Sequence, residues 1–226
     1  MVLTSAPVRI AVLLSGRGRG STLQAFLDAS AAGRLPAKVV AVVSTTPGTP
    51  AIARARQAGI PTVELDARGV PDGDDLDQRL LEALAPYAPD LICLTGFMRR
   101  LGARFCAAYR WRILNSHPAL IPAFCGKGFY GHHVHEAVLA YGAKVSGCTI
   151  HFVNEEYDAG PIIVQRCVPV LEDDTPEGLA ARVLPEEHQA YMQAITLFAE
   201  GRLRVAGRRV EILAPDQVSH GGNREA

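Results

Sequence analysis

The chain has 226 residues, of which 48% are hydrophobic and 20% are charged, and its 23 basic residues balance its 23 acidic ones. This composition is typical of a globular protein of one α/β domain or two small ones, with a core large enough to need no disulfide bonds. The absence of net charge argues against a non-specific nucleic-acid binder, whereas a small anionic substrate would need only a local site.

The first half of the chain alternates short apolar runs with segments of helical spacing. The apolar runs predict strands at 8–14, 38–44, 62–65 and 91–95. The segments between them predict helices at 21–32, 49–58 and 74–87. Strands that alternate with helices in this way predict a parallel sheet with crossover helices.

The pattern changes after residue 95. Helices are predicted at 99–109 and 133–141, with a brief strand at 112–115. A long loop rich in proline and glycine is expected between this strand and the second helix. Two β-rich runs, 145–154 and 162–170, are expected to pair antiparallel across a turn. A helix at 175–200 is expected to break at Pro185, and a small hairpin is expected at 202–210 around Gly207. The simplest organisation is one domain over 1–226 with its core at about 9–203 and flexible ends at 1–7 and 214–226.

The five cysteines stand far apart, at positions 93, 106, 125, 148 and 167, and no CxxC pair occurs. Buried thiols in a reducing compartment are therefore expected rather than disulfides or a zinc site. The apolar run near the N-terminus is too short for a signal peptide, and no stretch reaches membrane-spanning length. We expect a soluble, cytoplasmic protein with no membrane partner.

Segment 15–23 joins the first strand to the first helix and is rich in glycine and arginine. Glycines let backbone N–H groups approach an anion, the following helix N-terminus adds partial positive charge, and Arg17 and Arg19 add more. Ser21 or Thr22 would suit the helix N-cap. The spacing fits neither a Walker motif nor a dinucleotide fingerprint. The segment predicts a phosphate site, and the alternative is a tight turn that binds nothing.

Asn115 and His117 alternate at the end of a predicted strand, so both side chains point the same way. An amide beside an imidazole suits a reaction in which an oxyanion develops, because the amide stabilises the negative charge and the imidazole moves a proton. Asp158 lies in the turn between the two β-rich runs, and we expect it to raise the pKa of His117 if that turn folds over the imidazole. The alternatives are a core histidine, a turn-forming asparagine and an ordinary turn aspartate.

Three histidines, His132, His133 and His135, invite a metal hypothesis. Apart from Glu136, no cysteine or carboxylate stands at a convincing ligand spacing nearby. A solvated loop that runs into a helix is the better interpretation, and we predict no metal.

These motifs, in this order, resemble the phosphoribosylglycinamide formyltransferase family, and the resemblance runs from about residue 9 to 203. It is carried by Leu14-Ser15-Gly16, Gly20-Ser21-Thr22-Leu23-Gln24, Thr95-Gly96-Phe97-Met98-Arg99, Asn115-Ser116-His117-Pro118, His151-Phe152-Val153, Asp158-Ala159-Gly160-Pro161-Ile162-Ile163 and Glu187-His188. The Asn-x-His-Pro and Asp-x-Gly-Pro pair is typical of folate-dependent formyl transfer. The glycine-rich opening narrows the resemblance to the branch that acts on glycinamide ribonucleotide.

The resemblance implies a Rossmann-like, mostly parallel α/β sheet with antiparallel C-terminal strands, and direct transfer from 10-formyltetrahydrofolate to glycinamide ribonucleotide. It implies a catalytic set of Asn115, His117 and Asp158. The substrate phosphate and ribose would contact Gly18, Arg19, Gly20, Ser21, Thr22 and Glu187. The folate would contact Phe97, Met98, Arg99, Arg100, Leu101, Asn115, Asn154, Glu155, Glu156, Tyr157 and Asp158.

The chain departs from the family pattern in two loops. The phosphate loop carries an extra Gly-Arg, so Arg17 or Arg19 either contacts phosphate or faces solvent. Loop 122–135 is longer than usual, and its start is similar to that of formyltetrahydrofolate deformylases. The alternatives are such a deformylase, a methionyl-tRNA formyltransferase or a non-catalytic folate- or nucleotide-binding module. Whether the chain is a monomer or a homodimer stays open.

Overall fold

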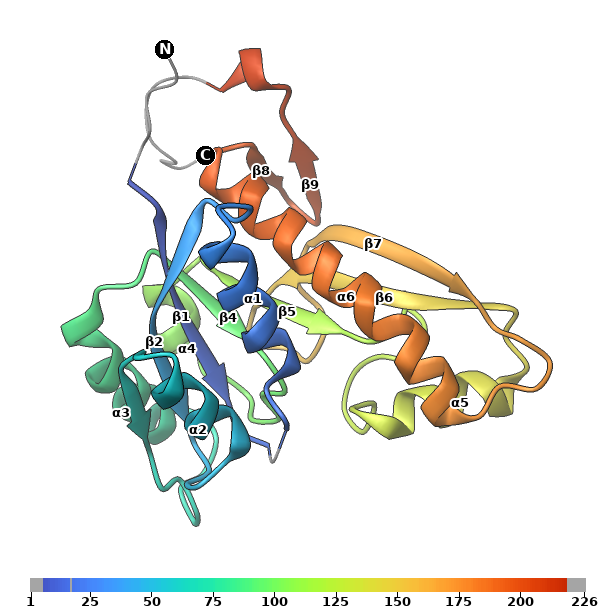
Figure 1. The fold of residues 1–226 in the computed structure, drawn as a ribbon, viewed down its shortest axis with the longest axis horizontal. Coiled ribbons are helices and arrows are strands. Elements are labelled where there is room, and N and C mark those ends of the chain that lie inside the picture. Colours follow the sequence, from blue (N-terminus) through green and yellow to red (C-terminus); the bar gives the residue numbers. More distant parts are fainter. Residues whose placement is uncertain (1–5, 17, 219–226) are drawn as a thin grey trace.

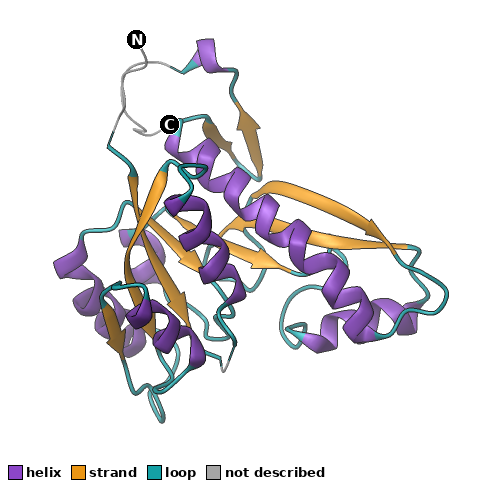
Figure 2. Cartoon of the chain, in the orientation of Figure 1, coloured by secondary structure: helices purple, strands orange, loops and turns teal. Residues whose placement is uncertain are grey.

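The computed structural model describes residues 6–16 and 18–218, in which one large sheet is flanked by helices (Figures 1 and 2). The strands are β1 Val8–Leu14, β2 Ala37–Ser44, β3 Thr62–Glu64, β4 Leu91–Leu94, β5 Ile113–His117, β6 Val145–Phe152, β7 Ile162–Pro169, β8 Leu203–Ala206 and β9 Arg209–Ile212. The helices are α1 Ser21–Ala31, α2 Pro50–Gln57, α3 Asp74–Leu84, α4 Ala103–Ala108, α5 His132–Tyr141 and α6 Pro176–Ala199, with 3₁₀ turns at Ala85–Tyr87 and Pro215–Gln217. The expected flexible ends lie mostly outside the described residues.

The sheet runs in the order β3-β2-β1-β4-β5-β6-β7-β9-β8. Strands β1 to β5 pair parallel, whereas β6 pairs antiparallel with β5 and with β7, and β8 pairs antiparallel with β9. The predicted parallel sheet with antiparallel C-terminal strands is confirmed. Because β1 has β2 on one side and β4 on the other, the strand order reverses there, and a crevice opens at the carboxyl ends of these strands.

Two apolar layers cover the two faces of the sheet. Along β1, Ile10 and Val12 face the layer that includes α1 and α6, whereas Ala11 and Leu13 face the layer that includes α3 and α4. Figure 1 shows α1 and α6 lying across the same face of the sheet. This strict alternation is the period of two expected of a strand buried on both faces.

The prediction that the C-terminal helix breaks at Pro185 is wrong, because α6 is continuous from Pro176 to Ala199 with Pro185 inside it. Pro185 is exposed, so the carbonyl that loses its helical partner lies on the side that water reaches. Buried side chains before and after it, such as Val183 and Tyr191, hold the two halves against one surface. Packing on both sides thus outweighs one missing hydrogen bond.

The helix predicted at 99–109 is also too long, since only Ala103–Ala108 is helical. Asp72 holds the preceding residues in another conformation, because its carboxylate accepts the Arg99 Nε–H over 2.6 Å and the Arg100 backbone N–H over 3.2 Å. The fully buried Asp77 then accepts the N–H groups of Gly102 over 2.8 Å and Phe105 over 3.0 Å. A carboxylate from α3 therefore fixes where α4 begins.

The thiols are less uniformly buried than expected. Cys93, Cys106 and Cys148 are buried, whereas Cys125 is partly accessible and Cys167 is exposed. Cys167 alternates along β7 with the buried Val168, so its side chain lies on the other face of that strand. Within residues 6–16 and 18–218, no helix combines the length and the hydropathy needed to cross a membrane.

We predict that Asp77→Ala lowers the free energy of unfolding by about 2–4 kcal/mol, because it leaves the buried Phe105 N–H and the part-buried Gly102 N–H without their acceptor. Chemical denaturation measures the change. Asp75→Ala, at an exposed position of the same helix, is the matched control and should change stability by less than about 0.5 kcal/mol. Equal effects of the two substitutions would contradict the capping role of Asp77.

Candidate active site

The glycine-rich loop lies at the sheet crevice, where the ends of β1 and β4 meet. The N–H groups of Ser15 and Gly16 both donate to the Gly96 carbonyl oxygen, over 3.3 and 3.2 Å. The N-cap of α1 is Gly20, with φ of 71°, and not Ser21 or Thr22 as expected. A Cβ at Gly20 would lie 2.9 Å from the Ala51 Cβ. Both the left-handed backbone and the close approach of α2 therefore require glycine.

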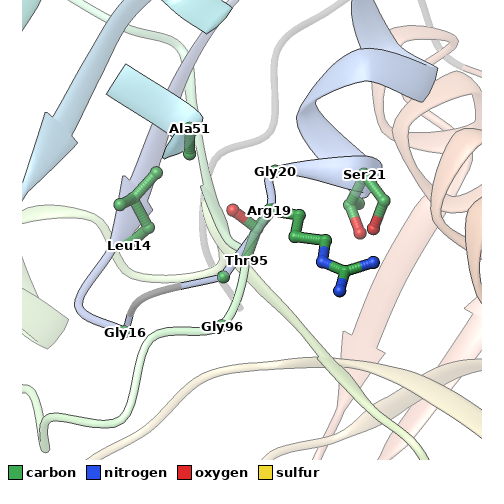
Figure 3. Close-up of a pocket in the computed structure, with 10 residues that line it drawn as sticks. Leu14, Gly16, Arg19, Gly20, Ser21, Ala51, Thr95 and Gly96 are labelled. Carbon is green, nitrogen blue, oxygen red and sulfur yellow. The ribbon is translucent and has the colours of Figure 1, made fainter. Parts of the chain in front are cut away.

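A cavity of about 140 Å³ opens beneath this loop, at the N-terminus of α1. Its lining includes Leu14, Gly16, Gly18, Arg19, Gly20, Ser21, Thr22, Ala51, Thr95 and Gly96. Figure 3 shows the Arg19 side chain reaching from the loop toward Ser21 at the first turn of the helix. Arg17 lies outside the described residues. Backbone N–H groups, a helix N-terminus and one guanidinium lie around the cavity, which is the combination that favours binding of an anion.

Arg54 of α2 supports the phosphate loop from behind and was not predicted. Its guanidinium donates to the Arg19 carbonyl oxygen over 3.4 Å and to the Gln24 side chain. Helical spacing places Arg54 three residues after Ala51, on the face that packs against the loop. The contact between Arg54 and the Arg19 carbonyl group joins residues that are far apart in the sequence, so the glycine-rich motif alone did not reveal it.

A second cavity, of about 60 Å³, lies on the other side of the crevice. Its lining comprises Leu94, Phe97, Arg99, Arg100, Leu101, Asn115, His151, Val153, Asn154, Glu156, Tyr157 and Asp158. Most residues expected at the folate line it, whereas Met98 and Glu155 lie outside that lining and are exposed. The Arg99 guanidinium is already bound to Asp72 and to the carbonyl groups of Ala67 and Val70, so it shapes the wall.

The three expected catalytic residues come together around one carboxylate. His117 Nδ1 lies 3.5 Å from Asp158 Oδ2, and His151 Nε2 lies 3.7 Å from Asp158 Oδ1. Asn115 Nδ2 donates to His151 Nε2 over 3.2 Å. His151 in turn donates from Nδ1–H to the Phe152 carbonyl oxygen over 2.8 Å, which fixes its tautomer. His151 is thus a fourth member of the cluster.

His151 was noted only as part of a motif, although the sheet register would have revealed its place. In the antiparallel β5–β6 pair, Asn115 stands directly opposite His151. Residues opposite each other on neighbouring strands bring their side chains within contact on the same face. Predicting that β6 returns beside β5 would therefore have placed His151 in the site.

The long loop after β5 holds the other side of the cluster. The His117 Nε2–H donates to the Phe124 carbonyl oxygen over 2.8 Å, and the Gly126 N–H donates to Asp158 Oδ2 over 2.9 Å. Phe124 and Asp158 both have left-handed backbones, with φ of 51° and 52°. Such conformations are costly for side-chain-bearing residues, so surrounding contacts must hold them in place.

Asp158 acts to raise the pKa of His117, as expected, but the net shift of that pKa is downward. Burial lowers the pKa of His117, and this effect outweighs the opposite effects of Asp158 and the Phe124 carbonyl group. For Asp158, burial acts to raise the pKa, but His151, His117 and the Gly126 N–H together lower it. The free site therefore holds an ionised carboxylate beside a histidine that loses its proton readily.

Glu187 lies apart from this cluster, on α6 and outside the lining of both cavities. Burial raises its pKa to about 6, and the neighbouring Ser116 side chain lowers it. The predicted ribose contact thus sits on the face of the sheet that α6 covers.

The histidines at the start of α5 contact carboxylates at the surface. His133 Nδ1 lies 3.0 Å from Glu136, and His132 Nε2 lies 3.2 Å from Glu177. His135 turns inward and is buried. Over the described ranges, no three ligand-type side chains gather in a geometry that would hold a metal ion.

A cavity with the lining of an anion site and a buried imidazole–carboxylate pair, both at the carboxyl edge of a parallel sheet, are features typical of an α/β enzyme. The chain belongs to the formyl transferase family, whose sequence model, described as Formyl transferase, matches residues 8–195, and within it to the phosphoribosylglycinamide formyltransferases.

Phosphoribosylglycinamide formyltransferase of Escherichia coli (strain K12) is 39% identical over 198 residues, which are 88% of this chain and 90% of that protein. The crystal structure of glycinamide ribonucleotide transformylase 1 from Symbiobacterium toebii matches with a TM-score of 0.85 and 45% identity, over 93% of this chain and 96% of that one. The trifunctional purine biosynthetic protein adenosine-3 of Drosophila melanogaster is 41% identical over 202 residues, which are 88% of this chain, but the chain spans only 14% of that protein's length.

We predict that His117 titrates below the value of a histidine in a model peptide, and that Asp158→Asn lowers its pKa further. The reason is that the carboxylate favours the protonated imidazole, and an amide of similar shape does not. Nuclear magnetic resonance of labelled histidine side chains measures both. A pKa that stays the same or rises in Asp158→Asn would show that Asp158 does not act on His117 through its charge.

Proposed function

We propose that the protein transfers the formyl group of 10-formyltetrahydrofolate to the amine of glycinamide ribonucleotide, a step of de novo purine biosynthesis. The observation that carries the proposal is the Asn115, His117 and Asp158 cluster, of which Asn115 and Asp158 line the second cavity. One cavity has the lining of a phosphate site, and the other has apolar and polar groups suited to a pterin and its side chain.

The phosphate of the ribonucleotide would bind at Gly18, Arg19, Gly20, Ser21 and Thr22, with Glu187 at the ribose. The folate would bind along the second cavity, against Phe97, Arg100 and Leu101 and under the turn of Asn154 to Asp158. Gly96 lines the first cavity and Phe97 lines the second, so the two cavities are neighbours, and the amine and the formyl carbon would be held side by side. Such positioning is itself a large part of catalysis of a two-substrate reaction.

In this mechanism the substrate amine attacks the formyl carbon directly, and no covalent enzyme intermediate forms. The Asn115 amide donates to the oxyanion that develops on the formyl oxygen, and protonated His117 adds positive charge beside it. Because His117 Nε2–H is bound to the Phe124 carbonyl group, Nδ1 is the atom that takes up and releases a proton. Asp158 faces that atom, and through water it helps to move a proton from the amine to the departing nitrogen.

The burial that lowers the pKa of His117 has a use in this scheme. A histidine that holds its proton weakly is a strong proton donor. Negative charge that develops on the formyl oxygen favours the protonated imidazole, so the stabilisation is greatest where the reaction needs it.

We predict that folate is deformylated only when glycinamide ribonucleotide is present, and that His117→Ala and Asn115→Ala each reduce the rate by about 10²–10³ or more. A spectrophotometric assay of deformylated folate measures the rates. His133→Ala, at an exposed position of α5, is the matched control and should keep full activity.

Other results would support other functions. Equal release of folate without the ribonucleotide would indicate a deformylase. Binding of either ligand without any release would indicate a non-catalytic module or a different acceptor.

We further predict that Arg19→Ala raises the KM for glycinamide ribonucleotide about 5- to 10-fold with little change in kcat, because it removes one charge from the phosphate site. Arg34→Ala, at an exposed position beyond the end of α1, controls for the loss of a positive charge elsewhere. An unchanged KM in Arg19→Ala would mean that this arginine faces solvent and leaves phosphate binding to the backbone.

A further inference from the structure

Two segments that follow neighbouring strands meet between the two cavities. Ser15 and Gly16 follow β1 and lead into the glycine-rich loop, whereas residues 96–98 follow β4 and lead into the wall of the second cavity. Because β1 and β4 pair in parallel, both segments leave the same edge of the sheet. Figure 3 shows the chain at Gly16 beside the chain at Gly96.

Three hydrogen bonds join these segments. The N–H groups of Ser15 and Gly16 donate to the Gly96 carbonyl oxygen, over 3.3 and 3.2 Å, and the Met98 N–H donates to Ser15 Oγ over 2.5 Å. The first two bonds join backbone groups that any residue other than proline could supply. The third depends on a side chain, so the Ser15 hydroxyl is the one member of this junction that a substitution can remove by itself.

Ser15 and Met98 connect the two cavities from outside both of them. Among the described residues, Gly16 belongs to the lining of the first cavity, and the two neighbours of Met98, Phe97 and Arg99, belong to the lining of the second, whereas Ser15 and Met98 belong to neither. The hydrogen bond between them therefore joins the wall of one cavity to the wall of the other without taking up space that a ligand needs.

We propose that Ser15 is a positioning residue that couples the two substrate sites through its hydrogen bond with the Met98 N–H. The proposal rests on the proposed function, because it takes the ribonucleotide phosphate in the first cavity and the folate in the second. A ligand that holds the glycine-rich loop keeps Ser15 against Met98 and thereby holds the wall of the second cavity. The second ligand then has less conformational freedom to remove when it binds.

The coupling acts equally in both directions, and its size is limited by the bond that carries it. Each substrate strengthens the binding of the other by the same factor, because the two orders of binding lead to the same complex. A hydrogen bond between uncharged groups contributes a factor of about 2 to 10 to an equilibrium constant. Ser15 cannot transmit more than its own bond contributes, so we expect it to carry a coupling of about 2- to 10-fold.

Calorimetric titration of glycinamide ribonucleotide, with and without saturating tetrahydrofolate, measures this coupling. Tetrahydrofolate carries no formyl group, so no reaction occurs, and the ratio of the two Kd values is the coupling factor. Ser15→Ala should lower this factor about 2- to 10-fold, and Ser15→Thr, which keeps a hydroxyl, should keep the wild-type factor. Direct contacts between the two ligands are common to all of these proteins and cancel in the comparison.

Thr46→Val is the matched control, because it removes a different hydrogen bond from the same residue. Thr46 Oγ1 donates to the Ser15 carbonyl oxygen over 2.5 Å, and this contact does not involve Met98. The substitution should leave the coupling factor unchanged, even where it weakens binding of the ribonucleotide. A loss of coupling as large as that in Ser15→Ala would show that the effect does not pass through the Met98 N–H.

Hydrogen exchange of the Met98 amide provides a second readout, which needs only the wild-type protein. Glycinamide ribonucleotide alone should slow this exchange about 2- to 10-fold, because it favours the arrangement in which the Met98 N–H is bonded. The Arg68 N–H, which donates to the Asp66 carboxylate over 3.2 Å at an exposed position far along the chain from the glycine-rich loop, is the control amide. Its exchange rate should not change.

A coupling factor that is the same in the wild-type protein and Ser15→Ala, or Met98 exchange that the ribonucleotide does not slow, would overturn the proposal and make Ser15 a structural residue. Failure of the wild-type protein to bind the ribonucleotide or tetrahydrofolate would instead count against the proposed function. The two failures are therefore distinguishable.

Discussion

The Asp158 carboxylate joins three segments of the chain, two of which the sheet already places side by side. One oxygen accepts the Gly126 N–H and faces His117, and the other faces His151. The end of β5, the end of β6 and the long loop after β5 are thereby brought to one point. Without this shared acceptor, two imidazoles would lie buried near each other with no negative charge to favour either in its protonated form.

The parallel sheet determines what surrounds that point. Loops that follow β1, β4 and β5 leave the same edge, so the glycine-rich loop, the segment after Leu94 and Asn115 are neighbours without any long-range signal in the sequence. The antiparallel return of β6 then adds His151 opposite Asn115. The two faces of β5 differ, since Asn115 and His117 belong to the cluster around Asp158 whereas Ser116 points toward α6.

The sequence predicted the elements that depend on local pattern. The strand at 8–14 was predicted with the bounds that the structure has, because a short apolar run that follows a proline and ends at glycines leaves little choice. Errors arose where distant residues decide the outcome. Asp72 and Asp77 shorten α4, packing on both sides carries α6 through Pro185, and Gly20 rather than a hydroxyl residue caps α1 because α2 comes so close. The downward net shift of the His117 pKa was missed for the same reason, since burial is a property of the folded chain.

The pairing of Asn115 with His151 has a consequence for how such enzymes diversify. The distance between these two side chains of the cluster is set by the hydrogen-bond ladder of the sheet, which does not depend on the lengths of the loops around it. Under the proposed function, insertions in the glycine-rich loop or in the loop after β5 can therefore reshape the pocket for the acceptor while the Asn115–His151 pair keeps its spacing. Loop exchange between relatives with different acceptors is accordingly a more promising route to new specificity than substitution on the strands.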